Sequence, residues 1–202
     1  MNEKFFDLKR EKQDRILNAA VKIFAQNGYR FASTDDMVRE AHISKGLLFH
    51  YFESKLGLYM FTYDYSVRYT KMELGNAVNP RETNFFAIYR QIEIAKLQVL
   101  KTYPYMQMFL DRAASENLGE ALLAVEERRN ELSDYCEKID AQADLSCFPK
   151  GVDGEKIRRI MKYTLRDLMN DHLNDHSFNA EMLFEENISY LLLLKKIAIP
   201  EI

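Results

Sequence analysis

Glycine and proline are both scarce in this chain of 202 residues, which contains only 7 Gly and 4 Pro. These two residues are the usual breaks in a regular helix, whereas Leu, Glu, Lys and Ala, which favour helices, are plentiful here. We therefore predict an almost entirely α-helical protein. Hydrophobic residues make up 47% of the chain and charged residues 29%, a balance that is typical of a globular protein and excludes a disordered one.

Cysteine and long apolar segments are rare as well. Cys136 and Cys147 are the only cysteines, and we expect free thiols, with a redox pair as the less favoured alternative. No apolar run approaches the roughly 20 residues of a membrane span. The N-terminus, MNEKFFDLKREKQDR, is charged and does not resemble a signal peptide. These features predict a cytoplasmic protein with no membrane partner.

The formal net charge of −3 argues against a wholly basic protein that coats nucleic acid. The charge is unevenly distributed, however. Residues 1–60 hold 10 Lys and Arg against 8 Asp and Glu, and the rest of the chain holds 18 against 23. Only the N-terminal third therefore has the positive charge that suits contact with phosphate groups.

The spacing of apolar residues predicts a succession of helices with short connections. Gly28 is expected to end the first helix in a left-handed conformation, and the aromatic residues Tyr29 and Phe31 are expected to pack under the next helix. Ser33 and Ser44 suit the N-cap positions of the second and third helices. The clearest long loop is 145–154. The expected helices cover residues 8–26, 34–41, 45–51, 55–74, 82–102, 104–116, 119–143, 154–174 and 179–197.

Residues 33–55 have the pattern of a helix-turn-helix. The recognition helix of this motif needs small or polar residues at its start, and Ser44, Lys45 and Gly46 meet that requirement. Ordinary packing of a helical hairpin with a polar surface explains the periodicity equally well. The apolar residues with the spacing to lock the two helices together are Met37, Val38, Ala41, Ile43 and Leu48.

Residues 15–61 resemble the tetracycline-repressor (TetR) family of bacterial transcription regulators. The resemblance is carried by ILNAAVKIFAQNGYRFAST, DMVREA and ISKGLLFHYFESKLGLY. Within these segments, F-x-x-x-G-Y, the SKG turn, the HYF aromatics and the following S-K form a specific combination. The resemblance favours DNA binding over an ordinary hairpin.

The resemblance implies a set of DNA-contacting residues. Ser33 caps the second helix, Thr34 contacts the DNA backbone, and Lys55 neutralises a phosphate. Leu48 and Phe52 are expected to point inward. The remaining contacts lie at the entry and on the outer face of the recognition helix, and they are Ser44, Lys45, Gly46, Leu47, Phe49, His50 and Tyr51.

Three residues depart from the family pattern. His42 stands where the family usually has Gly, Leu47 replaces a common Thr or Ser, and Phe49 replaces a Tyr. Histidine tolerates left-handed geometry better than most residues. Leu47 loses a hydrogen-bonding group but offers a surface to a thymine methyl group. The departures concern individual base contacts and leave the binding mode unchanged.

The family further implies an N-terminal DNA-binding domain, 1–54, and a helical domain, 55–202, that dimerises and holds an effector pocket, with the fourth helix as connector. Two copies would read a palindromic operator in double-stranded DNA. A small apolar or amphipathic effector would fit a lining of aromatic and Met residues, although such residues are more often plain core. The candidate pocket residues are Phe86, Tyr89, Tyr103, Met106 and Phe109, and the candidate dimer contacts, with core as the alternative, are Ile157, Met161, Leu168, Leu191 and Leu194.

His172 and His176 share a helix face, as zinc ligands do, but a solvated helix end is the favoured interpretation. We expect neither metal nor cofactor. No phosphate-binding glycine loop, nucleophile elbow or catalytic cysteine motif is present, so an enzyme is not expected. The sequence predicts a ligand-responsive, homodimeric repressor. The alternative is a helical adaptor or an activator that uses the same motif without an inducer.

Overall fold

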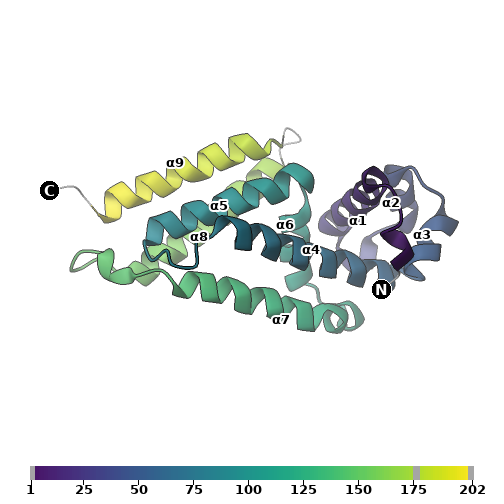
Figure 1. The fold of residues 1–202 in the computed structure, drawn as a ribbon, viewed down its shortest axis with the longest axis horizontal. Coiled ribbons are helices and arrows are strands. Elements are labelled where there is room, and N and C mark those ends of the chain that lie inside the picture. Colours follow the sequence, from purple (N-terminus) through teal and green to yellow (C-terminus); the bar gives the residue numbers. More distant parts are fainter. Residues whose placement is uncertain (1–2, 175–177, 200–202) are drawn as a thin grey trace. The chain divides into compact units, whose positions relative to one another are not determined.

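The computed structural model describes residues 3–174 and 178–199, and the regular elements in these ranges are all helices (Figure 1). The prediction of an all-α fold is confirmed. Short 3-10 helices occur at Glu3–Phe5 and Leu145–Cys147. The α-helices are α1 (Arg10–Phe31), α2 (Thr34–Ala41), α3 (Lys45–Phe52), α4 (Lys55–Ala77), α5 (Phe85–Thr102), α6 (Met106–Ala114), α7 (Gly119–Ala141), α8 (Gly154–Asn174) and α9 (Ala180–Ala198).

The helix starts follow the capping residues in the sequence. The side-chain oxygen of Ser33 accepts a hydrogen bond from the N–H of Asp36 at 3.3 Å, and that of Ser44 accepts one from Leu47 at 3.2 Å. Each bond satisfies a backbone donor that the first helical turn would otherwise leave unpaired. The predicted caps are confirmed, and α2 has its predicted bounds.

The end of α1 differs from the prediction. Gly28 has the expected positive φ of 67°, but the helix resumes after it and ends only at Phe31. The N–H of Ala32 donates to the carbonyl oxygen of Gly28 at 3.2 Å, which closes this additional turn. Gly28 therefore kinks the helix instead of ending it.

The helices pack into two compact units. The first unit contains Met1–Tyr69 and Thr102–Leu132, and the second contains Thr70–Lys101 and Ser133–Ile202. Helix α6 and the first part of α7 thus belong to the same unit as the N-terminal helices. The boundary between the units crosses α4 between Tyr69 and Thr70. The division into functional domains at residues 54 and 55 stays a prediction.

Aromatic side chains form much of the core of the first unit. The Phe24 ring lies 5.0 Å from the Tyr59 ring and 5.8 Å from the Phe109 ring, measured between centroids. All three side chains are at most 1% exposed. These contacts join α1, α4 and α6, because each helix contributes one ring.

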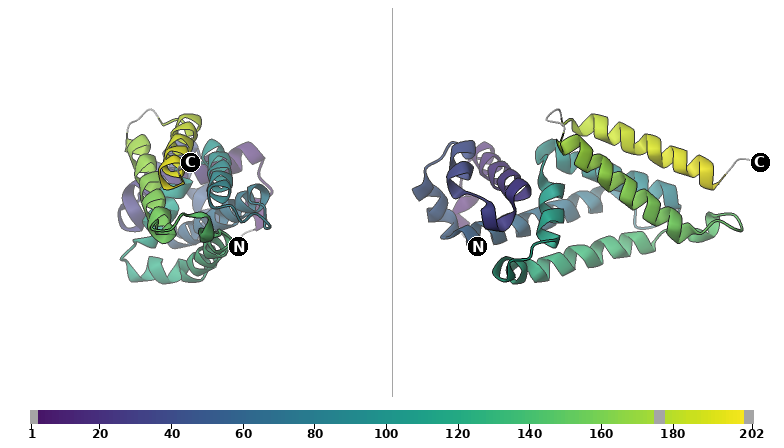
Figure 2. Two further views of the ribbon diagram at one scale, coloured as in Figure 1. Left: turned by 90° about the vertical axis from the view of Figure 1, so that its left-hand side faces the viewer. Right: turned by 180° about the vertical axis from the view of Figure 1, so that it is seen from behind.

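The second unit has its own apolar core, which includes Phe85, Ile88, Met161 and Leu165. Its helices α8 and α9 lie side by side in both figures (Figures 1 and 2). Cys136 and Cys147 are free, as predicted. Among the described helices, none contains a stretch that is long and apolar enough to cross a membrane.

Candidate DNA-binding surface

The helix-turn-helix is held together by buried apolar side chains on both of its helices. Met37 and Ala41 of α2 are each 1% exposed, and Leu48 of α3 is 2% exposed. Phe52, which was expected to point inward, is also buried. Burial of this kind fixes the angle between two short helices that would not be stable alone. The predicted inward positions are therefore confirmed.

His42 makes the turn between α2 and α3 in the left-handed conformation, with φ 52° and ψ 50°. Its N–H donates to the carbonyl oxygen of Arg39 at 3.2 Å, and the N–H of Ile43 donates to that of Val38 at 3.0 Å. This geometry explains why glycine is usual in the family at this position, and a histidine can adopt it at moderate cost.

The residues expected to contact DNA all retain exposed surface. Ser44, Lys45, Gly46 and His50 are exposed, whereas the others are half-buried. An added Cβ atom at Gly46 would meet no atom within 4 Å, so the start of α3 is open. The half-buried members of the set are Ser33, Thr34, Leu47, Phe49, Tyr51 and Lys55.

Lys45 already has an anionic partner within the motif. Its Nζ lies 2.8 Å and 3.0 Å from the two carboxylate oxygens of Asp35 on α2. The Lys45 and Asp35 side chains are 50% and 67% exposed, so water screens the pair and its net contribution to stability is small. A DNA phosphate that binds Lys45 would therefore compete with this carboxylate.

Lys55 contacts the end of α1. Its Nζ donates to the carbonyl oxygen of Arg30 at 3.1 Å and lies 4.8 Å from the centroid of the Tyr29 ring. Burial lowers the pKa of Lys55, whereas the nearby Glu120 and Glu116 favour its charged form. The sequence indicated only a phosphate contact for this residue, because these partners are distant along the chain.

The last turn of α1 offers two residues that the sequence interpretation did not include in this surface. Phe31 is 75% exposed, so the prediction that it packs under the next helix is wrong, whereas Tyr29 is buried as expected. The guanidinium of Arg30 lies 5.4 Å from the centroid of the Phe31 ring. An exposed cation and aromatic ring beside the α2 cap suit contact with a nucleic-acid backbone.

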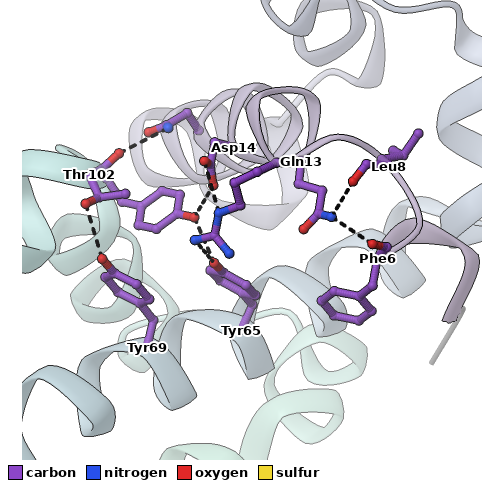
Figure 3. Close-up of polar contacts among 10 residues, drawn as sticks. Phe6, Leu8, Gln13, Asp14, Tyr65, Tyr69 and Thr102 are labelled. Carbon is purple, nitrogen blue, oxygen red and sulfur yellow. Dashed lines mark hydrogen bonds and ion pairs between the residues drawn. The ribbon is translucent and has the colours of Figure 1, made fainter.

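A cluster of polar side chains joins α1, α4 and the start of the α5–α6 connection within the first unit (Figure 3). The hydroxyl of Tyr103, which is 0% exposed, donates to Oδ1 of Asp14 at 2.7 Å. The hydroxyls of Tyr103 and Tyr65 are 2.8 Å apart, and Arg10 Nε donates to Oδ2 of Asp14 at 3.2 Å. Burial and these hydrogen bonds raise the pKa of Tyr103. Its hydroxyl is therefore a permanent donor at neutral pH.

Thr102 extends the same cluster. Its carbonyl oxygen accepts from Nδ2 of Asn18 at 3.2 Å, and its Oγ1 accepts from the hydroxyl of Tyr69 at 3.2 Å (Figure 3). Both bonds connect the end of α5 to helices of the first unit. The orientation of α1 is thus fixed by polar contacts as well as by apolar packing.

We expect Tyr103→Phe to lower the free energy of unfolding by about 1–3 kcal/mol, because it removes a buried hydrogen bond to a carboxylate. Urea unfolding followed by circular dichroism measures the change. Tyr163→Phe is the control, since Tyr163 is 50% exposed and should change stability little. Equal effects of the two substitutions would contradict the role given to the Tyr103 hydroxyl.

The candidate pocket residues belong to two separately packed cores. Tyr103, Met106 and Phe109 are in the first unit, and each is at most 1% exposed. Phe86 and Tyr89 are buried in the core of the second unit, where the Tyr89 hydroxyl donates to Oδ1 of Asp140 at 2.8 Å. That these five residues line an effector pocket stays a prediction. Their helical spacing reflects packing, which is the commoner use of aromatic residues.

The candidate dimer contacts are also mostly core. Met161 and Leu191 are 0% and 3% exposed and lie in the apolar core of the second unit, so neither is available to a partner. Ile157, Leu168 and Leu194 are half-buried against the same core. The burial of Met161 and Leu191 agrees with the alternative that they are core, and the assignment of the five residues to a dimer contact stays a prediction. The large apolar side chains that α8 and α9 do expose are Ile160, Tyr163, Met182, Tyr190, Leu192, Leu193 and Ile197.

The Nε2 atom of His172 lies 2.7 Å from a carboxylate oxygen of Glu186 on α9. His176 lies outside the described residues. Within 3–174 and 178–199, no group of three or more His, Cys, Asp or Glu side chains has an arrangement suited to a metal ion. The expectation that no metal binds here stays a prediction.

Residues 16–60, which contain the whole helix-turn-helix, match the family model described as "Bacterial regulatory proteins, tetR family". The N-terminal helices of this chain are thus similar to those of TetR-family regulators. A segment of 65 residues is 40% identical to the "Uncharacterized HTH-type transcriptional regulator YuxN" of Bacillus subtilis (strain 168). That match covers 31% of this chain and 22% of the length of the relative. TetR proteins are regulators, in agreement with the prediction that the chain is not an enzyme.

Solved structures of TetR regulators share the fold over almost the whole chain. A TetR family regulator from Chloroflexus aurantiacus J-10-FL has 20% identity and a TM-score of 0.61, over 97% of this chain and 90% of that one. PfmR from Thermus thermophilus has 20% identity and a TM-score of 0.59, over 93% of this chain and 95% of PfmR. FadR from Bacillus subtilis, solved with stearoyl-CoA, has 15% identity and a TM-score of 0.58, over 93% of this chain and 98% of FadR. The predicted arrangement, a helix-turn-helix followed by further helices, is confirmed.

Proposed function

We propose that this chain is a homodimeric, ligand-responsive repressor that binds a palindromic operator in double-stranded DNA. The open start of α3 is the observation that carries the proposal. An added Cβ atom at Gly46 has no neighbour within 4 Å. Leu48, on the same helix, is buried, whereas Ser44 and Lys45 are exposed. A recognition helix of this form can approach base edges closely.

The polar groups around Gly46 support contact with the DNA backbone. The Ser44 oxygen accepts from the Leu47 N–H, and this arrangement leaves the hydroxyl proton of Ser44 able to donate to a phosphate oxygen. Lys45 supplies a cation whose present partner is exposed to water. His50, one turn further along α3, is exposed and reaches the same side of the helix as Gly46.

A dimer is proposed because one recognition helix reads too few base pairs for useful specificity, whereas two copies read a palindrome. Exposed apolar side chains on α8 and α9 are suited to the contact between copies. Ile160 and Tyr163 on α8 are 49% and 50% exposed, and Leu193 and Ile197 on α9 are 51% and 65% exposed. Packed helices that expose this much apolar surface are typical of a protein–protein interface.

The effector is proposed to be a small apolar or amphipathic molecule that binds the second unit. That unit is rich in buried aromatic side chains, and it also buries a polar pair. Asn187 Nδ2 donates to Oε2 of Glu93 at 2.8 Å, and both residues are 2% exposed. The Oδ1 of Asn187 is buried with no hydrogen-bond partner in the described part of the chain, so it is suited to accept a hydrogen bond from a ligand. FadR, which shares the fold, was solved with the amphipathic ligand stearoyl-CoA.

We expect Gly46→Leu to weaken binding to the operator by about tenfold or more, equivalent to at least ~1.4 kcal/mol, because the new side chain would hold α3 away from the base edges. Fluorescence anisotropy with duplexes from the chain's own upstream region measures the effect, in a salt series. Gly119→Leu is the matched control, since Gly119 is also exposed and has no neighbour within 4 Å of an added Cβ.

Both variants should fold like the parent protein, because both glycines are exposed and an added Cβ atom meets no atom within 4 Å at either position. Equal affinities of the two variants would contradict the placement of α3 against DNA. Absence of any salt-sensitive, sequence-specific binding by the parent protein would contradict the proposed function itself.

A further inference from the structure

The first described turn of the chain, the 3-10 helix Glu3–Phe5, is packed into the first unit through Phe5. The Phe5 side chain is 0% exposed, whereas that of its neighbour Phe6 is 47% exposed. Residues this close to the start of a chain are usually poorly ordered unless a specific contact holds them. The complete burial of Phe5 therefore indicates that this segment has a defined partner in the fold.

The partner of Phe5 is the junction between α3 and α4. The centroid of its ring lies 6.0 Å from that of Tyr51 and 5.4 Å from that of Phe52, and these are the last two residues of α3. The ring of Phe61, on α4, lies 4.9 Å away. The contacts with Tyr51 and Phe61 are edge-to-face, a favourable arrangement that gives the rings a defined orientation. Phe5 thus connects the end of the proposed recognition helix to α4.

Gln13 of α1 fixes the backbone of the same segment (Figure 3). Its side-chain amide donates to the carbonyl oxygens of Phe6 and Leu8, at 3.0 Å and 2.7 Å. The N–H of Leu8 donates in turn to the carbonyl oxygen of Phe5 at 3.2 Å. Gln13 is only 8% exposed, so water competes little for the bonds that its amide makes. The segment is therefore held to α1 by its backbone and to α3 by the Phe5 ring.

The orientation of Tyr51 depends on this packing. Helix α3 has only eight residues, too few to be stable without tertiary contacts. Three described rings contact that of Tyr51, and two of them, His50 and Phe52, belong to α3 itself. Phe5 alone among the three comes from another segment. It therefore provides the ring contact that relates Tyr51 to the rest of the unit.

We propose that Phe5 is a positioning residue for DNA binding, which sets the orientation of Tyr51 at the end of the recognition helix. Phe5 does not contact DNA itself, because its side chain is fully buried. The inference rests on the proposed function, since it takes Tyr51 as a DNA contact. It adds a segment that precedes the helix-turn-helix to the determinants of operator binding.

Hydrogen exchange in the full chain, without DNA, tests the packing directly. The N–H of Glu53 donates to the carbonyl oxygen of Phe49 at the end of α3, at 2.9 Å. The N–H of Leu48 donates to that of Ser44 at the start of the helix, at 3.2 Å. Phe5→Leu keeps an apolar side chain but removes the ring, so exchange at Glu53 should accelerate about tenfold or more relative to Leu48. Global destabilisation would accelerate both amides equally.

Operator binding, measured by fluorescence anisotropy, tests the role in function. Tyr51→Phe removes only the hydroxyl group and should weaken binding by the parent chain about tenfold or more, equivalent to ~1.4 kcal/mol. In a Phe5→Leu chain the same substitution should weaken binding about threefold or less, because the hydroxyl group is no longer held in place. A loss of stability alone would leave the effects of the two substitutions additive.

Phe6→Leu is the matched control, because Phe6 is the adjacent residue and its described ring contacts are with Phe5 and Phe61 and not with α3. It should leave both the exchange at the end of α3 and the effect of Tyr51→Phe as they are in the parent chain. Unchanged relative exchange in Phe5→Leu, or additive effects of Phe5→Leu and Tyr51→Phe, would overturn the proposal.

A parent chain that binds no operator specifically would contradict the proposed function and, with it, the role of Phe5 in DNA binding. The exchange experiment needs no DNA and therefore separates that outcome from a failure of the contact between Phe5 and α3.

Discussion

Replacing Leu193 and Ile197 together by Glu is expected to convert the proposed dimer into a monomer and to lower operator affinity about 100-fold or more, since tethering two binding sites commonly contributes a factor of that size. The two side chains lie one helical turn apart on α9 and are 51% and 65% exposed. Carboxylates at these positions would have to enter an apolar contact without partners, which is strongly unfavourable. The fold of each subunit should persist, because both side chains point away from the core.

Size-exclusion chromatography with light scattering gives the mass, and fluorescence anisotropy gives the affinity for the operator. Lys195→Glu is the control. It adds negative charge to the same helix, about 200° around the helix axis from Leu193, and Lys195 is itself exposed. A double variant that stays dimeric and binds the operator normally would show that the exposed face of α9 is not the interface.

Gly57→Ala is expected to lower the free energy of unfolding by about 3 kcal/mol, at the upper end of what an added methyl group costs in a tightly packed position. A Cβ atom on Gly57 would overlap the carbonyl oxygen of Phe52, the last residue of α3. The backbone cannot move aside easily, because the Gly57 N–H donates to the side-chain oxygen of Ser54 at 2.9 Å. Glu53, which makes the corner, already has a φ of 63°.

Gly46→Ala provides the contrast to Gly57→Ala. Gly46 is in a helix and open to solvent, so alanine should stabilise the chain by up to about 1 kcal/mol through helix propensity. Urea unfolding monitored by circular dichroism compares the two variants with the parent. The signs of the two changes are expected to be opposite, and a Gly57→Ala protein as stable as the parent would contradict the close approach of α4 to α3.

Features that depend on neighbouring residues were predictable from the sequence. Ser33 and Ser44 are caps because their side chains reach donors only three residues away. The open position of Gly46 and the inward direction of Leu48 follow in the same way from motif and periodicity. The fold class and the ten candidate DNA contacts rest on such local signals.

Features that depend on distant residues were not predictable. The Tyr103 hydroxyl binds Asp14 across 89 positions of the chain, and no local pattern distinguishes this partner from a ligand. Met161 and Leu191 have the spacing of an apolar helix face, but spacing alone does not tell whether that face meets its own core or a partner. The assignment of pocket and dimer residues stays a prediction for this reason, since it requires knowledge of which side chains meet a ligand or a partner.

The ion pair between Lys45 and Asp35 also affects the thermodynamics of DNA binding. When a lysine neutralises a phosphate, the DNA releases a condensed counterion, and this release produces the dependence of affinity on salt. If Lys45 binds a phosphate as proposed, that phosphate competes with Asp35 for the same ammonium group. The ion pair that is lost is itself weakened by salt, whereas the contact that is gained releases a counterion. Loss of the intramolecular pair therefore opposes part of the salt dependence that the new phosphate contact would produce.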